Sequence, residues 1–349
     1  MPGNQSSRLL FSEEELHNSV PKFLFTAFEG FLVALTNLTL FLAVLRQPLL
    51  RARNDCLVLA SLALHDSING IGSVLAGTLR TAKVYLGTAN QLGTSLDCLL
   101  KPWNILWVLV WDHMYGAVLL SVSVDRLIMI SKPMSYLSWR SGYIVALLCS
   151  VHVPYIFCIG AMLWMLVSEG PLSVDKPALC FTSWAYPNHT YYQFIHTQNM
   201  LMGLMSVVLY LLVGCKYVRH KKNKVAATKS GASKSKQIKE QRRMTVTVAF
   251  SCLCTLLFHV TPMLARQVIS AVDPSNRLGA FIIPYGSMVQ YVNPLCNFGL
   301  YMHRHRDLRL GVSHLFKCEE LSLAKLNQTG GYQSSKSKAL AKSKTSNQK

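Results

Sequence analysis

The sequence has few charged residues for its length, and acidic residues are the scarcer kind. Charged residues make up 15% of the 349 residues, whereas a typical soluble domain has about 25%. With 35 Lys and Arg against 16 Asp and Glu, the formal net charge is +19. Such an excess often marks a nucleic-acid-binding protein. Here, however, 51% of the residues are hydrophobic and lie in long blocks, so we expect no nucleic-acid partner.

The sequence also lacks the motifs of several chemical classes. It contains no GxSxG or HExxH motif, which argues against common hydrolases and metalloproteases. Its 10 cysteines form no CxxC pair and no zinc spacing. It shows no internal repeat of the kind that many transporters carry. We therefore expect neither an enzyme nor a bound metal.

Seven apolar blocks are long enough to cross a bilayer as helices, which takes about 20 mostly apolar residues. They span residues 23–45, 56–79, 100–129, 143–167, 192–214, 244–270 and 278–302. We predict an all-α fold, a seven-transmembrane helical bundle over residues 22–311. Residues 1–21 then form an extracellular N-terminus, and residues 312–349 form a basic, Ser-rich cytoplasmic tail whose composition predicts disorder.

The basic residues predict how the bundle is oriented. Placed on the seven blocks, 27 of the 35 Lys and Arg gather on one membrane face, and the positive-inside rule makes that face cytoplasmic. The N-terminus is then outside and the C-terminus cytoplasmic, in a multi-pass protein of the plasma membrane. The glycosylation sequons at Asn4 and Asn188 fall outside, as their use requires.

Cysteines on the two faces carry different expectations. Cys98 and Cys180 lie on the outer side, where oxidising conditions predict a disulfide between them; two free cysteines are the alternative. Cys318 follows a basic amphipathic stretch on the inner side, so it is a candidate for palmitoylation, with a plain free thiol as the alternative.

Polar side chains inside the blocks are expensive in a bilayer, so each is a functional candidate. Asp66 lies in the second block, Asp112 in the third, and the pair Asp125-Arg126 ends the third. The uncharged polar residues and interrupting prolines are Asn37, Asn293, Pro262 and Pro294.

In this order and at these membrane faces, the motifs resemble the rhodopsin-like (class A) G-protein-coupled receptor family over roughly residues 22–311. The motifs that carry the resemblance are Asn37, Leu62-Ala63-Leu64-His65-Asp66, Asp125-Arg126-Leu127, Lys132-Pro133-Met134-Ser135-Tyr136, Pro262 and Asn293-Pro294-Leu295-Cys296-Asn297. Tyr210 also fits the inner Tyr of the fifth helix. The departures are Leu127 for the Tyr after the Asp-Arg pair, Val260 for the sixth-helix Trp, Asn297 for the closing Tyr and Met202 for the fifth-helix Pro. They leave the subfamily unresolved and would suit a divergent chemosensory or orphan receptor.

The resemblance implies a two-state receptor. An extracellular ligand, either a small molecule or a peptide, shifts the helix bundle so that its inner end activates a heterotrimeric G protein. The implied G-protein switch is Asp125, Arg126, Tyr136 and Tyr210. An interfacial Arg that only reaches the headgroups is the alternative for Arg126. The usual acidic lock on the sixth helix is absent, since its position resembles Arg242.

Inside the membrane, the resemblance implies a polar hub and a pivot. Asn37, Asp66, Asn293 and Pro294 form the hub. Because Tyr115 and Val289 replace small polar ligands, we expect a hydrogen-bond hub at Asp66 rather than bound sodium. Pro262 is the expected pivot of the sixth helix, with a static bend as the alternative.

The ligand pocket is expected between the outer halves of four helices. Its candidates are Trp107, Val108, Trp111, Asp112, Tyr192, His196, His259, Met263, Arg266, Gln267 and Tyr285. Simple packing or an interfacial belt is the alternative for the aromatic ones. An amine paired with Asp112 is one possible ligand. We expect no retinal cofactor, because the Schiff-base Lys position resembles Ser287.

The inner loop and the tail imply further partners. The basic stretch from Lys216 to Arg243 fits recognition of the G protein and of anionic lipids, or it only anchors topology. Serines and threonines after residue 327 fit phosphorylation and arrestin docking, with a plain solvated tail as the alternative. A membrane transporter or channel is the rival to the receptor interpretation.

Overall fold

The computed structural model describes residues 11–100, 103–132, 135–136, 139, 141–168, 176–181, 186, 189–227, 250–272 and 277–317. Only the helical backbone is described for residues 103–113, 141, 189, 217, 220–227, 270–271, 277–285 and 287.

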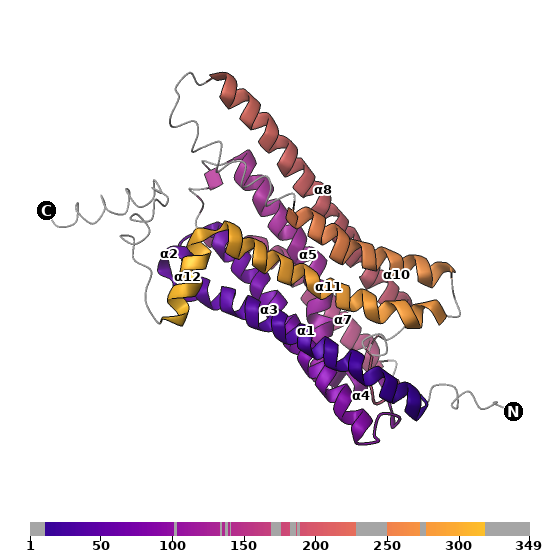
Figure 1. The fold of residues 1–349 in the computed structure, drawn as a ribbon. Coiled ribbons are helices and arrows are strands. Elements are labelled where there is room, and N and C mark those ends of the chain that lie inside the picture. Colours follow the sequence, from indigo (N-terminus) through magenta and orange to yellow (C-terminus); the bar gives the residue numbers. More distant parts are fainter. Residues whose placement is uncertain are drawn as a thin grey trace.

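Seven long helices run side by side through the described part of the chain, as predicted (Figure 1). They are α1 (Glu13–Arg46), α3 (Asn54–Tyr85), α5 (Trp103–Ser131), α7 (Ser141–Ser168), α8 (His189–Ala227), the helix of residues 250–272 and α11 (Arg277–Arg304). The helix of residues 250–272, called helix VI below, contains η3 (Leu256–Val260) and α10 (Thr261–Val272). By length and composition, six of these helices could cross a membrane. The 28 residues of α11 extend about 42 Å, more than the roughly 30 Å hydrocarbon layer.

Short elements close the two ends of the bundle (Figure 1). At one end lie α2 (Pro48–Arg51) and α12 (Arg306–Phe316); we call this the inner end. At the other lie α4 (Ser95–Leu100) and a two-stranded antiparallel sheet of β1 (Leu92–Gly93) and β2 (Lys176–Pro177); we call this the outer end.

Two helices extend beyond the apolar blocks that predicted them. Helix α1 begins at Glu13, inside the segment predicted to precede the bundle, because Ser12 and Glu15 form a capping box and acidic residues in its first turn favour the helix dipole. Helix α8 continues to Ala227, since the basic residues after Cys215 are good helix formers.

The third predicted block covers the end of α4 and nearly all of α5. Cys98 lies in α4, and α5 begins only at Trp103. Residues 101 and 102, between these two helices, lie outside the described residues.

Helices α1 and α3 approach closely because glycines face the contact. A Cβ added to Gly70 would lie 2.6 Å from the backbone nitrogen of Ala34, and one added to Gly30 would lie 2.7 Å from the carbonyl oxygen of Gly70. Small residues allow this backbone contact in membrane helices. The contact places Asn37 and Asp66 in the buried interior of the bundle.

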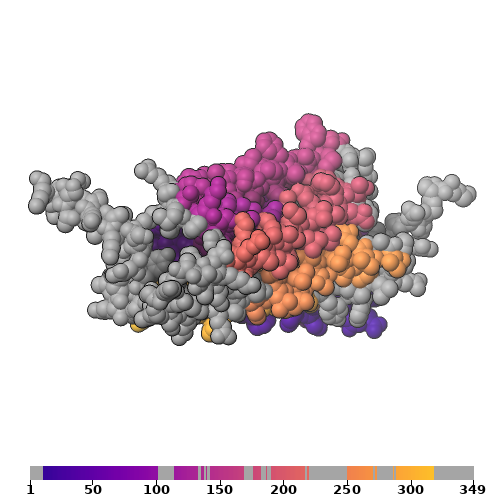
Figure 2. Space-filling view, turned by 90° about the horizontal axis from the view of Figure 1, so that it is seen from above, coloured from indigo at the N-terminus to yellow at the C-terminus, as the bar shows by residue number. Residues whose placement is uncertain are grey.

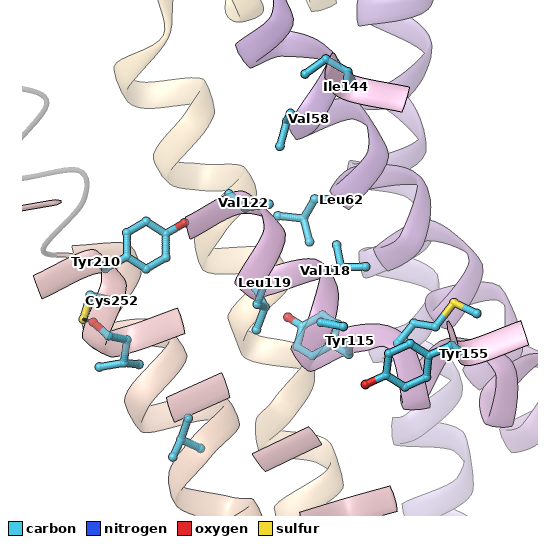
Figure 3. Close-up of a cluster of buried hydrophobic side chains, with 14 residues drawn as sticks. Val58, Leu62, Tyr115, Val118, Leu119, Val122, Ile144, Tyr155, Tyr210 and Cys252 are labelled. Carbon is cyan, nitrogen blue, oxygen red and sulfur yellow. Dashed lines mark hydrogen bonds between the residues drawn. The ribbon is translucent and has the colours of Figure 1, made fainter. Parts of the chain in front are cut away.

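The main apolar core joins α3, α5, α7, α8 and helix VI around Tyr115, Val118, Leu119 and Val122 of α5 (Figure 3). Large apolar side chains also cover the outside, such as Phe157 and Trp164 of α7, which are both 74% exposed. Figure 2 shows α7 in magenta, α8 in salmon and α10 in orange along one face of the molecule. An apolar exterior of this kind suits contact with lipid.

Candidate functional site

At the inner end, Asp125 of α5 anchors the segment that follows α5. Its side chain is fully buried, and Oδ1 accepts hydrogen bonds from the hydroxyls of Tyr136 (3.0 Å) and Tyr143 (3.4 Å). The ring of Trp139 packs on Tyr143 with centroids 4.9 Å apart. Burial, and then the charge of Asp125, raise the pKa of Tyr136, so this phenol keeps its proton and remains a donor at neutral pH.

Arg126 is held by neighbours on α5 and α3. Its Nε lies 4.0 Å from Oδ2 of Asp125, and its Nη2 donates to the backbone carbonyl of Asp55 at 3.5 Å. The side chains of Tyr210 and Tyr301 are within electrostatic range of the guanidinium. The structure thus brings together all four residues of the predicted switch. Arg242, where the sequence predicts a missing lock, lies outside the described residues.

A network of ion pairs that the sequence does not predict lies beside Arg126. Arg53 contacts Oδ2 of Asp55 and Oδ2 of Asp307, each at 2.7 Å, and so ties the start of α3 to α12. Burial opposes the charge of Arg53, but the carboxylate of Asp55, with help from Asp307, raises its pKa above the ordinary value. Burial lowers the pKa of the adjacent His305 to about 4, with Arg126 as the next cause.

In the middle of the bundle, the predicted hub residues are buried. The hydrogen bonds of Asn37 and Asn293 go to residues outside the predicted hub. Asn37 donates to the carbonyl of Val33 at 3.0 Å, within its own helix. Asn293 donates to the hydroxyl of Tyr115 at 2.9 Å. Within the described chain, Oδ1 of Asp66 has no hydrogen-bond partner. Tyr115, noted in the sequence only as a replacement for a sodium ligand, is therefore the partner of Asn293.

Tyr115 also contacts two buried histidines. The ring of His65 on α3 stacks on it with centroids 5.5 Å apart and an interplanar angle of 25°. The ring of His259 on helix VI meets it edge-on at 4.7 Å and 65°. Tyr115 therefore links α3, helix VI and α11 from its position on α5.

Helix VI is irregular just before Pro262. Residues Leu256–Val260 form a π-helical turn, and the N–H of Thr261 bonds to the carbonyl of Leu256, five residues back. A proline has no N–H to continue the regular ladder, and single π turns often accompany function. The predicted pivot at Pro262 thus coincides with a locally rearranged helix.

At the outer end, the predicted disulfide between Cys98 and Cys180 is present. Arg80 of α3 fixes the same loop, because its guanidinium donates to the carbonyls of Leu179 (3.2 Å) and Cys180 (3.0 Å). Lys83 donates to the carbonyl of Ala178. These contacts hold β2 and the disulfide over the end of α3.

Four of the described pocket candidates lie together between α8 and helix VI. Tyr192 meets His196 edge-on at 4.4 Å, and the guanidinium of Arg266 lies 4.9 Å from the ring centroid of Tyr192. Gln267 donates to Oγ1 of Thr197 at 3.3 Å. Met263 is buried. His259 lies apart from this group, against Tyr115.

The sequence model of one family, the 7 transmembrane receptor (rhodopsin family), matches residues 36–301, about three quarters of the chain. The chain belongs to the rhodopsin family of seven-transmembrane receptors. None of the curated proteins matches it significantly. As a member of this family it is a multi-pass membrane receptor that signals through G proteins, and the family is a receptor family rather than an enzyme family.

Several predicted residues of this receptor lie outside what the structure describes. For the pocket these are the side chains of Trp107, Val108, Trp111, Asp112 and Tyr285, and that of Ser287 at the Schiff-base position. Asn4, Asn188, Cys318 and the tail after it are outside as well. The predictions made for them remain predictions.

Proposed function

We propose that this receptor binds an extracellular ligand at its outer end and activates a heterotrimeric G protein through Arg126 at its inner end. The observation that carries the proposal is the setting of Arg126. It lies beside the buried Asp125, and its contacts with Oδ2 of Asp125, at 4.0 Å, and with the backbone carbonyl of Asp55, at 3.5 Å, are long. A guanidinium held this weakly is easily released when the bundle changes its packing.

The ligand contacts we propose are Tyr192, His196 and Arg266. Aromatic rings with one cation suit a small molecule or peptide that carries an acidic or aromatic group. An amine that pairs with Asp112 is the alternative ligand. We propose no retinal cofactor, because Ser287 cannot form a Schiff base, and no sodium at Asp66.

We propose that the receptor lies in the plasma membrane with its N-terminus outside. The disulfide at the outer end suits an oxidising exterior. Arg51, Arg53, Arg306 and Arg309 at the inner end follow the positive-inside rule. The Ser-rich tail is the proposed arrestin site, and the family match favours this account over a transporter or channel.

The test is nucleotide exchange by purified G proteins with the full-length receptor in lipid nanodiscs. A panel covering the G-protein classes should include one that the receptor accelerates without added ligand. Arg126→Ala should lower that acceleration at least tenfold, whereas Arg51→Ala, which removes an exposed charge at the same end, should leave it unchanged. Equal exchange by Arg126→Ala and wild type would contradict the proposal.

A further inference from the structure

The π turn of helix VI places an imidazole at the centre of the bundle. His259 is 2% exposed and Val260, its neighbour in the same turn, is also 2% exposed. Helix α8 packs directly on this turn, because a Cβ added to Gly203 would lie 3.1 Å from Cδ2 of His259 and 3.3 Å from Cγ2 of Val260. Both side chains are therefore enclosed.

His259 contacts Tyr115, a residue that also reaches α11. Its ring meets Tyr115 edge-on at 4.7 Å, and the hydroxyl of Tyr115 accepts the hydrogen bond of Asn293. Val260 belongs to the apolar core that includes Tyr115, but it is aliphatic and makes no ring contact. A path of direct contacts thus runs from the π turn through Tyr115 to the Asn293-Pro294 motif of α11. Figure 3 shows the ring of Tyr115 among the core residues of α5.

The imidazole of His259 is poorly satisfied in this packing. Within the described chain, neither of its ring nitrogens has a hydrogen-bond partner, and neither has Oγ1 of Thr255 one turn earlier. Unpaired buried polar groups raise the free energy of the state that contains them. The edge-on contact of the two rings favours this packing, and the unpaired nitrogens oppose it, so small changes at His259 shift the balance.

We propose that His259 is a positioning residue that couples the pivot of helix VI at Pro262 to α11, acting through Tyr115. This inference rests on the proposed function. It moves His259 from the expected ligand pocket to the transmission of the signal. The ring contact stabilises the packing of the structure described here, and a change of packing at the π turn releases both Tyr115 and Asn293.

Two buried cysteines of helix VI report its opening without a ligand or a G protein. Cys252 and Cys254 lie in the turns before η3 and are free and buried. Outward movement of the inner part of helix VI exposes them to a polar maleimide. Cys56, which is buried on α3, reports global unfolding instead. Labelling rates of the full-length receptor in nanodiscs, measured by peptide mass spectrometry, are read beside basal nucleotide exchange.

The variants distinguish the loss of the ring contact between His259 and Tyr115 from a general loss of packing in the π turn. We expect His259→Ala to raise both the labelling of Cys254 and the basal exchange about fivefold, the size of one aromatic contact. His259→Phe keeps the ring edge and removes the unpaired nitrogens, so its labelling and basal exchange should not exceed those of wild type. Val260→Ala, the matched control in the same turn, should stay within twofold of wild type. Tyr115→Phe combined with His259→Ala should add nothing to His259→Ala alone.

Each possible result either supports or overturns the role proposed for His259. If His259→Ala also exposes Cys56, His259→Leu, which keeps the volume without the ring edge, replaces it in the comparison. Both readouts equal to those of Val260→Ala would overturn the inference, and the proposed function would stand if Arg126→Ala still lowers exchange. If no G protein responds to the wild type, the proposed function fails. The labelling rate of Cys254 in His259→Ala relative to wild type then decides alone whether His259 holds helix VI in place.

Discussion

The hydroxyl of Tyr136 donates a hydrogen bond to the carboxylate of Asp125 across 3.0 Å. This bond fastens the segment after α5 to the residue beside Arg126. The carboxylate is fully buried. The hydrogen bonds that it accepts from two tyrosine hydroxyls therefore take the place of hydrogen bonds to water. The carboxylate of Asp125 thus contacts both Tyr136, in the segment after α5, and Arg126. A movement of that segment therefore changes the surroundings of Arg126.

Tyr136→Phe should therefore destabilise the receptor. A hydrogen bond to a charged group contributes about 1.5–3 kcal/mol, and the free energy of unfolding should fall by about that amount. Thermal unfolding of the purified receptor measures it. Tyr143→Phe is the control, since its bond of 3.4 Å is longer and its loss should cost less. A larger loss for Tyr143→Phe would show that Tyr136 is not the main anchor.

Much of this architecture follows from the sequence because apolar blocks of membrane length are a strong signal. Asp125, Arg126, Tyr136 and Tyr210, which the sequence names as the switch, lie near one another in the structure. The contact between Arg53 and Asp307 escaped prediction because 254 positions separate the two residues. The sequence does not predict the π turn, because the turn depends on how the backbone adapts to Pro262 and to Gly203 of the neighbouring helix α8. Tyr115 and His259 look like ordinary core residues until their contact is seen.

The link between α3 and α12 should be measurable as a coupling between Arg53 and Asp307. Both side chains are partly exposed, so solvent screens the pair and we expect about 0.2–1 kcal/mol. A double-mutant cycle with Arg53→Ala and Asp307→Asn isolates this energy. A coupling of zero within error would show that α12 is held in place by apolar contacts alone.

Acidification should weaken the inner end through His305. Its pKa in the folded receptor, about 4, lies below the ordinary value near 6.5, so the unfolded state binds the proton more readily. The free energy of unfolding should thus decrease as the pH falls from about 6.5 to about 4. His305→Gln should flatten this dependence in thermal unfolding experiments. The same slope in both proteins would exclude His305 as its source.

The close approach of α1 and α3 predicts different tolerance at two glycines. Gly70→Ala forces a Cβ against the backbone of Ala34 and should cost about 1–3 kcal/mol or more, with reduced yield of folded receptor. Gly160→Ala on α7 is the control, because a Cβ there has no neighbour within 4 Å. Size-exclusion profiles and melting temperatures compare the two. Equal behaviour would mean that α1 can move away at little cost.

The most direct test of the central claim is the formation of a nucleotide-free complex between the receptor and a heterotrimeric G protein. Co-elution is measured with apyrase present and again after GTP is added. We predict that the wild-type receptor forms a complex that GTP dissociates, and that Arg126→Ala forms at most a tenth as much. A complex of equal amount with Arg126→Ala, or co-elution that GTP does not change, would contradict the account.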